Sequence, residues 1–123
     1  MIAPNKIIIA ELKKRHPNIP VIGFPKGAGG KLIAYAQQVG MDAIGVDETV
    51  DPHWANENLP KNLPVQGNLD PLALVAGGDA LENSVRNIKD AFKSRPHIFN
   101  LGHGIVPDTP LAHVEKLITL IKE

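Results

Sequence analysis

The sequence has no cysteine, no excess of charge of either sign and no long apolar run. The absence of cysteine excludes disulfide bonds and thiolate-bound metals, and it agrees with a reducing compartment. Thirteen basic residues balance thirteen acidic ones, so no overall field would attract nucleic acid or an anionic membrane. No segment approaches the roughly 18 apolar residues of a membrane span, and no basic stretch followed by an apolar run opens the chain. We therefore expect a cytoplasmic protein without nucleic-acid or membrane partners.

The composition is that of one ordinary globular domain. Hydrophobic residues make up 43% of the chain and charged residues 21%, which supplies enough apolar material for a buried core. At 123 residues the chain is well short of the roughly 200 or more of a complete eightfold β/α barrel. We expect a single domain over residues 1–123.

Short apolar runs alternate with helix-like patterns. The expected strands are residues 21–24, 43–46, 64–67 and 98–101. The expected helices are residues 5–15, 32–39 and 51–58, a long surface helix on Leu81, Val85, Ile88 and Phe92, and a last helix that starts at Thr109-Pro110 with Leu111, Val114, Ile118 and Ile121 as its apolar face. This alternation predicts an α/β fold of about four parallel β/α units. Half of a closed barrel and a small open doubly wound sheet both remain possible.

Two Asp-Pro pairs mark helix starts. Asp51-Pro52 and Asp70-Pro71 each place a capping carboxylate before a proline at the first helical position. Capping is the favoured interpretation of both aspartates, ahead of a catalytic role.

Polar residues follow the ends of the expected strands. The carboxyl ends of parallel barrel strands point to the functional face, so Lys26, Asp47, Asn68 and His103 would line a site. Asp47 either contacts a ligand or fixes neighbouring loops through hydrogen bonds.

His103 is the strongest candidate among them. It lies between Gly102 and Gly104, whose missing side chains let a substrate approach the backbone closely. Its imidazole suits hydrogen bonding or proton transfer near neutral pH, although a loop histidine can also simply cap a turn.

Two weaker patterns are open to simpler explanations. The glycine-rich segment 27–30 precedes an expected helix but matches neither the phosphate-loop nor the dinucleotide spacing, so a tight turn is favoured over an anion cradle. The remaining histidines lack a metal-ligand spacing, and we expect them to be solvated and not to form a metal site: His16, His53, His97 and His113.

Three segments together resemble the uroporphyrinogen decarboxylase family. They are residues 65–71 (VQGNLDP), 100–105 (NLGHGI) and 107–110 (PDTP), and the segments 23–29 and 45–47 are similar to loops of the same family. The resemblance covers essentially the whole chain. Glu48 departs from the aromatic residue that the family often has after the Asp47 position.

The resemblance implies the C-terminal half of a (β/α)8 TIM barrel, with the N-terminal half absent. It implies stepwise loss of CO2 from the four acetate side chains of uroporphyrinogen III, without a cofactor, by an enzyme that is a homodimer when intact. It implies a catalytic role for His103, and we assign substrate binding to Gly102, Gly104, Asp47 and Lys26. The arginine-rich segment and the aspartate that binds the pyrrole N–H groups would come from the missing half.

The chain alone has too little positive charge for such a substrate. Its arginines are expected to face away from the site, because Arg15 and Arg95 precede strands and Arg86 lies on the outside of a helix. Only Lys26 and Lys31 lie at the expected site, whereas a substrate with many carboxylates calls for arginine forks. The isolated chain should therefore be inactive.

A half barrel also exposes its interior. Strands starting at Val21 and Ile98 would be free edges, which favours self-association of the chain. The side chains expected to face the interior are Ile22, Phe24, Ile44, Val46, Val65, Phe99 and Leu101.

Two alternatives remain. A related barrel methyltransferase would activate thiols on a zinc held by cysteines, which this chain lacks. A stand-alone α/β module that binds a small anion would need no missing half.

Overall fold

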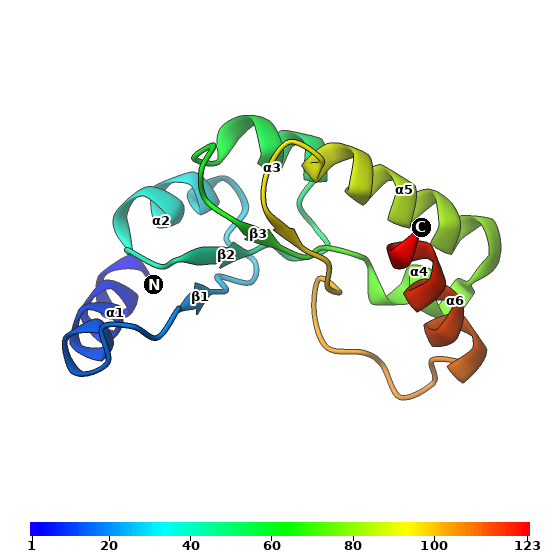
Figure 1. Cartoon of the computed structure of the whole chain (residues 1–123), viewed down its shortest axis with the longest axis horizontal. Coiled ribbons are helices and arrows are strands. Elements are labelled where there is room, and N and C mark those ends of the chain that lie inside the picture. Colours follow the sequence, from blue (N-terminus) through cyan, green and yellow to red (C-terminus); the bar gives the residue numbers. More distant parts are fainter.

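The computed structural model describes all residues 1–123 and contains one four-stranded parallel sheet (Figure 1). The strands are β1 (Ile22–Gly23), β2 (Ala43–Gly45), β3 (Val65–Gln66) and β4 (His97–Ile98), and they lie in the order β1-β2-β3-β4. Each strand pairs in parallel with the strand that precedes it in the sequence, and the order never reverses. A doubly wound sheet needs such a reversal, whereas a barrel does not. The α/β prediction is confirmed, and the arrangement is consistent with part of a barrel.

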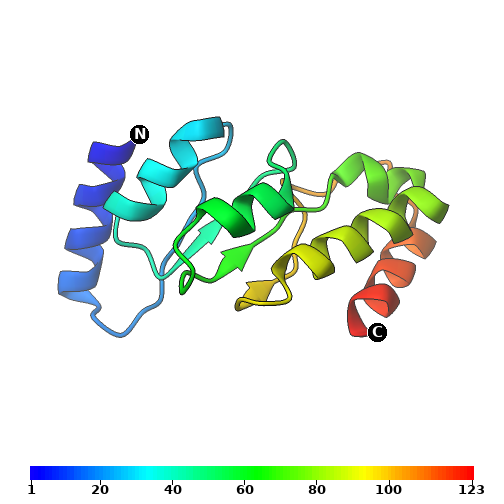
Figure 2. The same cartoon turned by 90° about the horizontal axis from the view of Figure 1, so that it is seen from above.

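The helices lie on one side and at the two ends of this sheet. They are α1 (Ile2–Arg15), α2 (Leu32–Gln38), α3 (Pro52–Asn58), α4 (Pro71–Ala76), α5 (Gly78–Phe92) and α6 (Leu111–Lys122), with a 3₁₀ turn, η1 (Gly29–Lys31), before α2. Figures 1 and 2 show α2, α3 and α5 over one face of the sheet, α1 at one end and α4 and α6 at the other. The opposite face carries no helix.

The core lies between the sheet and the helices. Ile44 and Val65 are fully buried there, together with Leu81, Val85 and Phe92 of α5. On the uncovered face Ile22, Phe24 and Ile98 are 44%, 47% and 47% exposed. One face of the sheet is therefore buried beneath the helices, whereas side chains on the other face are about half exposed.

The set of side chains expected to face the interior was partly wrong. Ile22, Phe24 and Leu101 border the open face, and Val46 reaches both that face and the core. Ile44, Val65 and Phe99 instead pack into the helical core. The reason is the register, in which Ile44 pairs with Gly23 and Val65 rather than with Ile22. Buried parallel strands are apolar on both faces, so their sequences show no alternation of apolar and polar residues. The sequence therefore could not predict which side chains face the helices and which face the open side.

Several element boundaries also differ from the expectation, beginning with α1, which starts at Ile2 rather than residue 5, and with strands that are shorter than expected. β4 is His97–Ile98 rather than residues 98–101, and only an isolated bridge between Leu69 and Leu101 continues the pairing. The helix that starts at Pro71 ends at Ala76, and the long surface helix starts at Gly78, because Gly77 and Gly78 take positive φ values of 67° and 51°. The last helix begins at Leu111, and the Thr109 hydroxyl donates to the carbonyl of Val106 instead of capping it.

The two Asp-Pro helix starts are confirmed. Asp51 accepts a hydrogen bond from the Trp54 backbone N–H at 2.8 Å, and Asp70 accepts one from Leu72 N–H at 2.8 Å. Both carboxylates are thus engaged in capping.

Two histidines expected in solvent are packed instead. His97 donates through Nε2 to the Gly67 carbonyl at 2.6 Å and lies beside the ring of Phe92. His113 donates through Nδ1 to the Leu74 carbonyl at 3.0 Å. Neither contact could be expected from spacing alone, since both partners are distant in the sequence.

Candidate functional site

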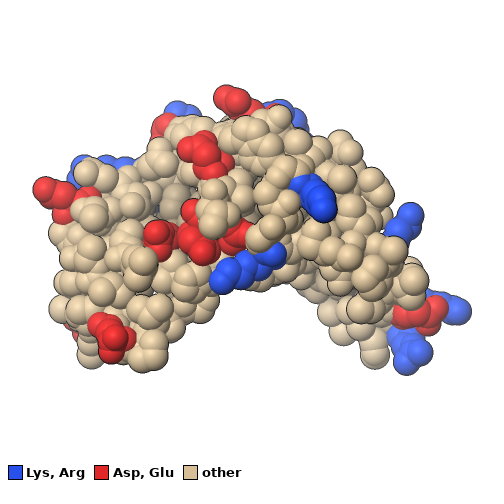
Figure 3. All heavy atoms as spheres, turned by 180° about the vertical axis from the view of Figure 1, so that it is seen from behind, with Lys and Arg blue, Asp and Glu red and all other residues tan.

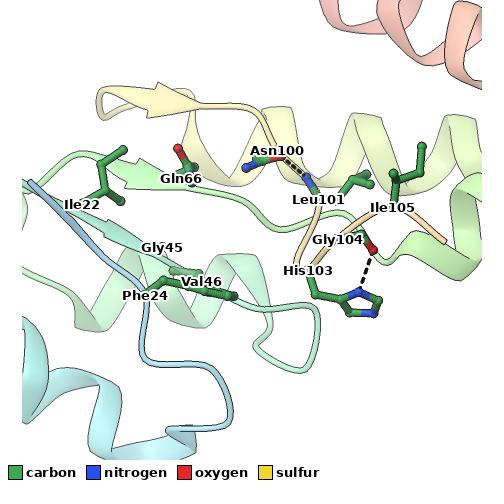
Figure 4. Close-up of a pocket in the computed structure, with 10 residues that line it drawn as sticks. All are labelled: Ile22, Phe24, Gly45, Val46, Gln66, Asn100, Leu101, His103, Gly104 and Ile105. Atoms are coloured by element: carbon green, nitrogen blue, oxygen red, sulfur yellow. Dashed lines mark hydrogen bonds between the residues drawn. The ribbon is translucent and has the colours of Figure 1, made fainter. Parts of the chain in front are cut away.

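A hollow of about 470 Å³ lies on the open face, toward the carboxyl ends of the strands. Figure 3 shows the molecule as an arch with a hollowed underside, and Figure 4 shows the side chains around the hollow. Half of the lining residues are apolar, and none is a lysine or arginine: Ile22, Phe24, Gly45, Val46, Gln66, Asn100, Leu101, His103, Gly104 and Ile105. The site therefore combines an apolar wall with a few polar groups, as ligand sites do.

The loop after β4 places His103 at this hollow. The bridge at Leu101 and a 2.7 Å hydrogen bond from Gly102 N–H to the Leu69 carbonyl fix the start of the loop. The imidazole is 29% exposed, and its Nδ1 lies 2.9 Å from the Gly104 carbonyl oxygen (Figure 4). His103 is thus held by its own loop while remaining accessible from the hollow.

The two glycines beside His103 differ in their surroundings. A Cβ on Gly102 would lie 2.3 Å from the backbone nitrogen of Glu48, so this position must remain glycine for the two loops to touch. A Cβ on Gly104 would meet nothing within 4 Å. Gly102 therefore joins the loops, whereas Gly104 leaves open space at the hollow.

Asp47 is buried and fully engaged with its own loops. Its carboxylate accepts hydrogen bonds from Gly27 N–H at 2.7 Å, from Thr49 N–H at 2.9 Å and from the Thr49 hydroxyl. Burial opposes ionisation of this carboxyl, but the hydrogen bonds from Thr49 and Gly27 and the charge of Lys26 outweigh it and hold its pKa below the usual value. Asp47 thus ties the glycine-rich segment to the loop after β2.

Lys26 and Asn68 lie outside the hollow. Lys26 is exposed at the start of the glycine-rich loop and is not a lining residue. Asn68 is buried, and its amide donates to the carbonyls of Asp47 at 3.0 Å and Val50 at 2.6 Å. The fold therefore brings only His103 and Gly104 of the predicted site residues directly to the hollow.

Three polar residues at the site were not among the predicted ligand-binding residues. Gln66 and Asn100 line the hollow, and Glu48 places Oε1 3.8 Å from His103 Nε2. Gln66 could have been recognised as a polar residue within an apolar strand. Asn100 could have been recognised because it lies in the same short segment as His103. Glu48 could have been recognised because it replaces the aromatic residue that the family often has at this position.

The structure contains no group of three or more histidine, cysteine, aspartate or glutamate side chains that could hold a metal ion. None of its helices is long and apolar enough to cross a membrane.

Comparison with known proteins identifies the family. A family model described as uroporphyrinogen decarboxylase (URO-D) matches residues 1–123. Proteins named uroporphyrinogen decarboxylase from Sphingopyxis alaskensis, Rhizorhabdus wittichii and Novosphingobium aromaticivorans are 69%, 62% and 55% identical over 122 residues. Each alignment covers 99% of this chain and 36% of the relative. The chain belongs to the uroporphyrinogen decarboxylase family and spans about a third of the length of these relatives.

Proposed function

We propose that this member of the uroporphyrinogen decarboxylase family is the C-terminal part of an enzyme that converts uroporphyrinogen III to coproporphyrinogen III. The family match over the whole chain, together with a hollow at the strand ends that contains His103, carries the proposal. In this proposal, the remaining length of the relatives would supply the part of the barrel that faces the open side of this sheet.

The reaction requires a proton, an electron sink and a place for carboxylates. Protonation of a pyrrole ring of the substrate lets the bond between the acetate methylene and its carboxyl carbon break, with the electron pair passing into the ring. Carbon dioxide leaves, and a proton is added to the methylene carbon to yield a methyl group. The proton first added to the ring is then lost, which restores the pyrrole, so each decarboxylation consumes one proton in all. The ring itself is the electron sink, so the chemistry needs neither a metal nor an organic cofactor.

His103 is the residue of this chain that would act on the substrate directly. Its accessible imidazole would orient a substrate carboxylate or donate a proton to it, and proton exchange near neutral pH suits this side chain. Open space at Gly104 would let the substrate approach the backbone. Gly102 would keep the loop in place through its contact with Glu48.

Asp47 and Lys26 would act from the neighbouring loops. Asp47 would hold the glycine-rich loop against the site, because its carboxylate already accepts hydrogen bonds from Gly27 and Thr49. Lys26 is exposed and would offer a positive charge to a substrate carboxylate at the rim.

The rest of the protein would supply the main anion-binding groups. No lysine or arginine lines the hollow, and the buried guanidinium of Arg95 donates to Asn56 and to carbonyls at the other side of the fold. A substrate with many carboxylates needs several forked donors, so the isolated chain would bind it weakly and would not turn it over.

The alternative function, a stand-alone α/β module that binds a small anion, has less support. The amide of Gly27, which an anion cradle would use, already donates to Asp47 at 2.7 Å. A binding screen with uroporphyrin and inorganic phosphate on this chain distinguishes the two. Selective binding of the porphyrin is expected, whereas binding of phosphate alone would contradict the proposal.

A further inference from the structure

Glu48 holds a carboxylate against the candidate site without enough hydrogen-bond donors. Its side chain is only 18% exposed, and Oε2 is buried with no donor from the protein. A buried carboxylate oxygen without a donor raises the free energy of the folded state. Such a group is stabilised by a neighbouring positive charge.

His103 is the partner in the one ion pair that Glu48 makes. The two side chains come from the loops after β2 and β4, and Glu48 Oε1 lies 3.8 Å from His103 Nε2. The contact between Gly102 and the backbone of Glu48 fixes the two loops relative to each other. The backbones of the two loops therefore hold Glu48 and His103 close to each other.

The other ring nitrogen decides which form of the imidazole fits this geometry. Nδ1 of His103 lies 2.9 Å from the Gly104 carbonyl oxygen, and a carbonyl oxygen only accepts, so Nδ1 carries a proton. In a neutral ring Nε2 would then present a lone pair to the carboxylate of Glu48. Only a ring with protons on both nitrogens makes both contacts favourable.

We propose that Glu48 is a positioning residue that holds the His103 ring at the hollow and keeps a proton on Nε2. This inference rests on the proposed function, in which His103 acts on a substrate carboxylate. The separation of 3.8 Å is longer than a hydrogen bond, so the Nε2 proton remains free for a substrate oxygen. In a hollow lined by no lysine or arginine, the imidazolium supplies a positive charge at the hollow itself, in addition to that of Lys26 at the rim.

Nitrogen-15 NMR of histidine-labelled chain tests this inference without any substrate. In the unchanged chain at neutral pH, both nitrogens of His103 should show the chemical shifts of protonated nitrogens. In Glu48→Gln, which keeps the shape and removes the charge, the Nε2 signal should move to the range of a bare nitrogen. Glu57→Gln is the matched control, because Glu57 is exposed on α3 and its loss changes the net charge equally.

A second variant separates charge from shape. Glu48→Asp keeps the carboxylate and should keep the protonated Nε2 signal. A bare Nε2 in the unchanged chain, the same spectrum in Glu48→Gln, or loss of the proton in Glu48→Asp and Glu48→Gln alike would each overturn the proposal.

Kinetics of the complete protein separate this inference from the proposed function. Glu48→Gln should raise KM for uroporphyrinogen III about tenfold through loss of a charge-assisted contact, with a smaller change in kcat. A lower kcat at unchanged KM would contradict the positioning role. Absence of turnover in the unchanged complete protein would refute the proposed function, while the NMR spectra would still decide whether Glu48 keeps the proton on Nε2 of His103.

Discussion

His103 and Glu48 belong to different strand-end loops, and the fold brings them together at the hollow of the open face. The sequence offered His103 as a candidate through its place between two glycines after an apolar strand, and the family resemblance strengthened that prediction. The sequence was not sufficient to pair the two residues, because that contact depends on the register of β2 to β4 and on the close approach of Gly102.

Substitution of His103 should impair catalysis without unfolding the chain. We expect His103→Ala in the complete protein to lower the rate about tenfold to a thousandfold, because an oriented donor is lost from an accessible loop. The melting temperature should change little. His16→Ala, at the exposed end of α1, is the control. Unchanged kinetics of His103→Ala would leave this histidine with only a structural role.

His97 should make the stability of the chain depend on pH. Burial lowers its pKa below the ordinary value of 6.5, and the hydrogen bond to Gly67 offsets part of this effect. The unfolded chain therefore binds a proton at His97 more readily than the folded chain does. Protonation of His97 thus leaves the free energy of unfolding unchanged above about pH 6.5 and lowers it at lower pH.

Thermal melts between about pH 7.5 and pH 5.5 measure this dependence. His97→Gln should show a smaller decrease in melting temperature over that range than the unchanged chain. An equal decrease in both proteins would mean that another group titrates.

Among the elements, the order of helices and strands could be predicted from the sequence, but boundaries and faces less well. Asp51-Pro52 set the start of α3 correctly because its cap is local. The extent of β4 and the break at Gly77 could not be set, since both depend on partners elsewhere in the fold.

The face of α6 is the clearest difference at this scale. Leu117 and Leu120 are its buried residues, whereas Leu111 and Ile118 of the predicted apolar face are 72% and 47% exposed. The helix carries apolar residues on more than one side, and packing against α4 and α5 selects which side is buried.

A pair of matched substitutions tests this packing. Leu117→Ala removes buried methyl groups and should lower the free energy of unfolding by about 2–4 kcal/mol. Leu111→Ala changes an exposed residue and should alter it by less than about 0.5 kcal/mol. Urea denaturation of both variants gives the comparison, and a larger loss for Leu111→Ala would mean that the helix packs on its other face.

For the whole molecule, the main feature is an arch with one uncovered side. β1 and β4 are free edges, and Ile22, Phe24 and Ile98 are about half exposed on the open face. Unpaired parallel edges and exposed apolar side chains favour association with another chain or segment. The parallel order of the strands could be predicted from the sequence. Which side chains stay exposed on the open face could not be predicted, because that depends on the register between the strands.

We expect the isolated chain to self-associate through the free edges or the open face. Analytical ultracentrifugation at micromolar concentrations should show species larger than a monomer. Phe24→Glu, which places a charge on the open face, should shift the distribution toward monomer, whereas Leu72→Glu, at an exposed position of α4, should not. A stable monomer of the unchanged chain would show that the open face needs no cover.

The turnover of uroporphyrinogen III tests the central claim most directly. The assay measures coproporphyrinogen III formed by this chain alone and by a protein in which the chain is joined to the remaining length of its relatives. We predict that the joined protein forms the product and that the chain alone forms none, because no lysine or arginine of this chain lines the hollow. Product from the chain alone, or none from the joined protein, would contradict the account.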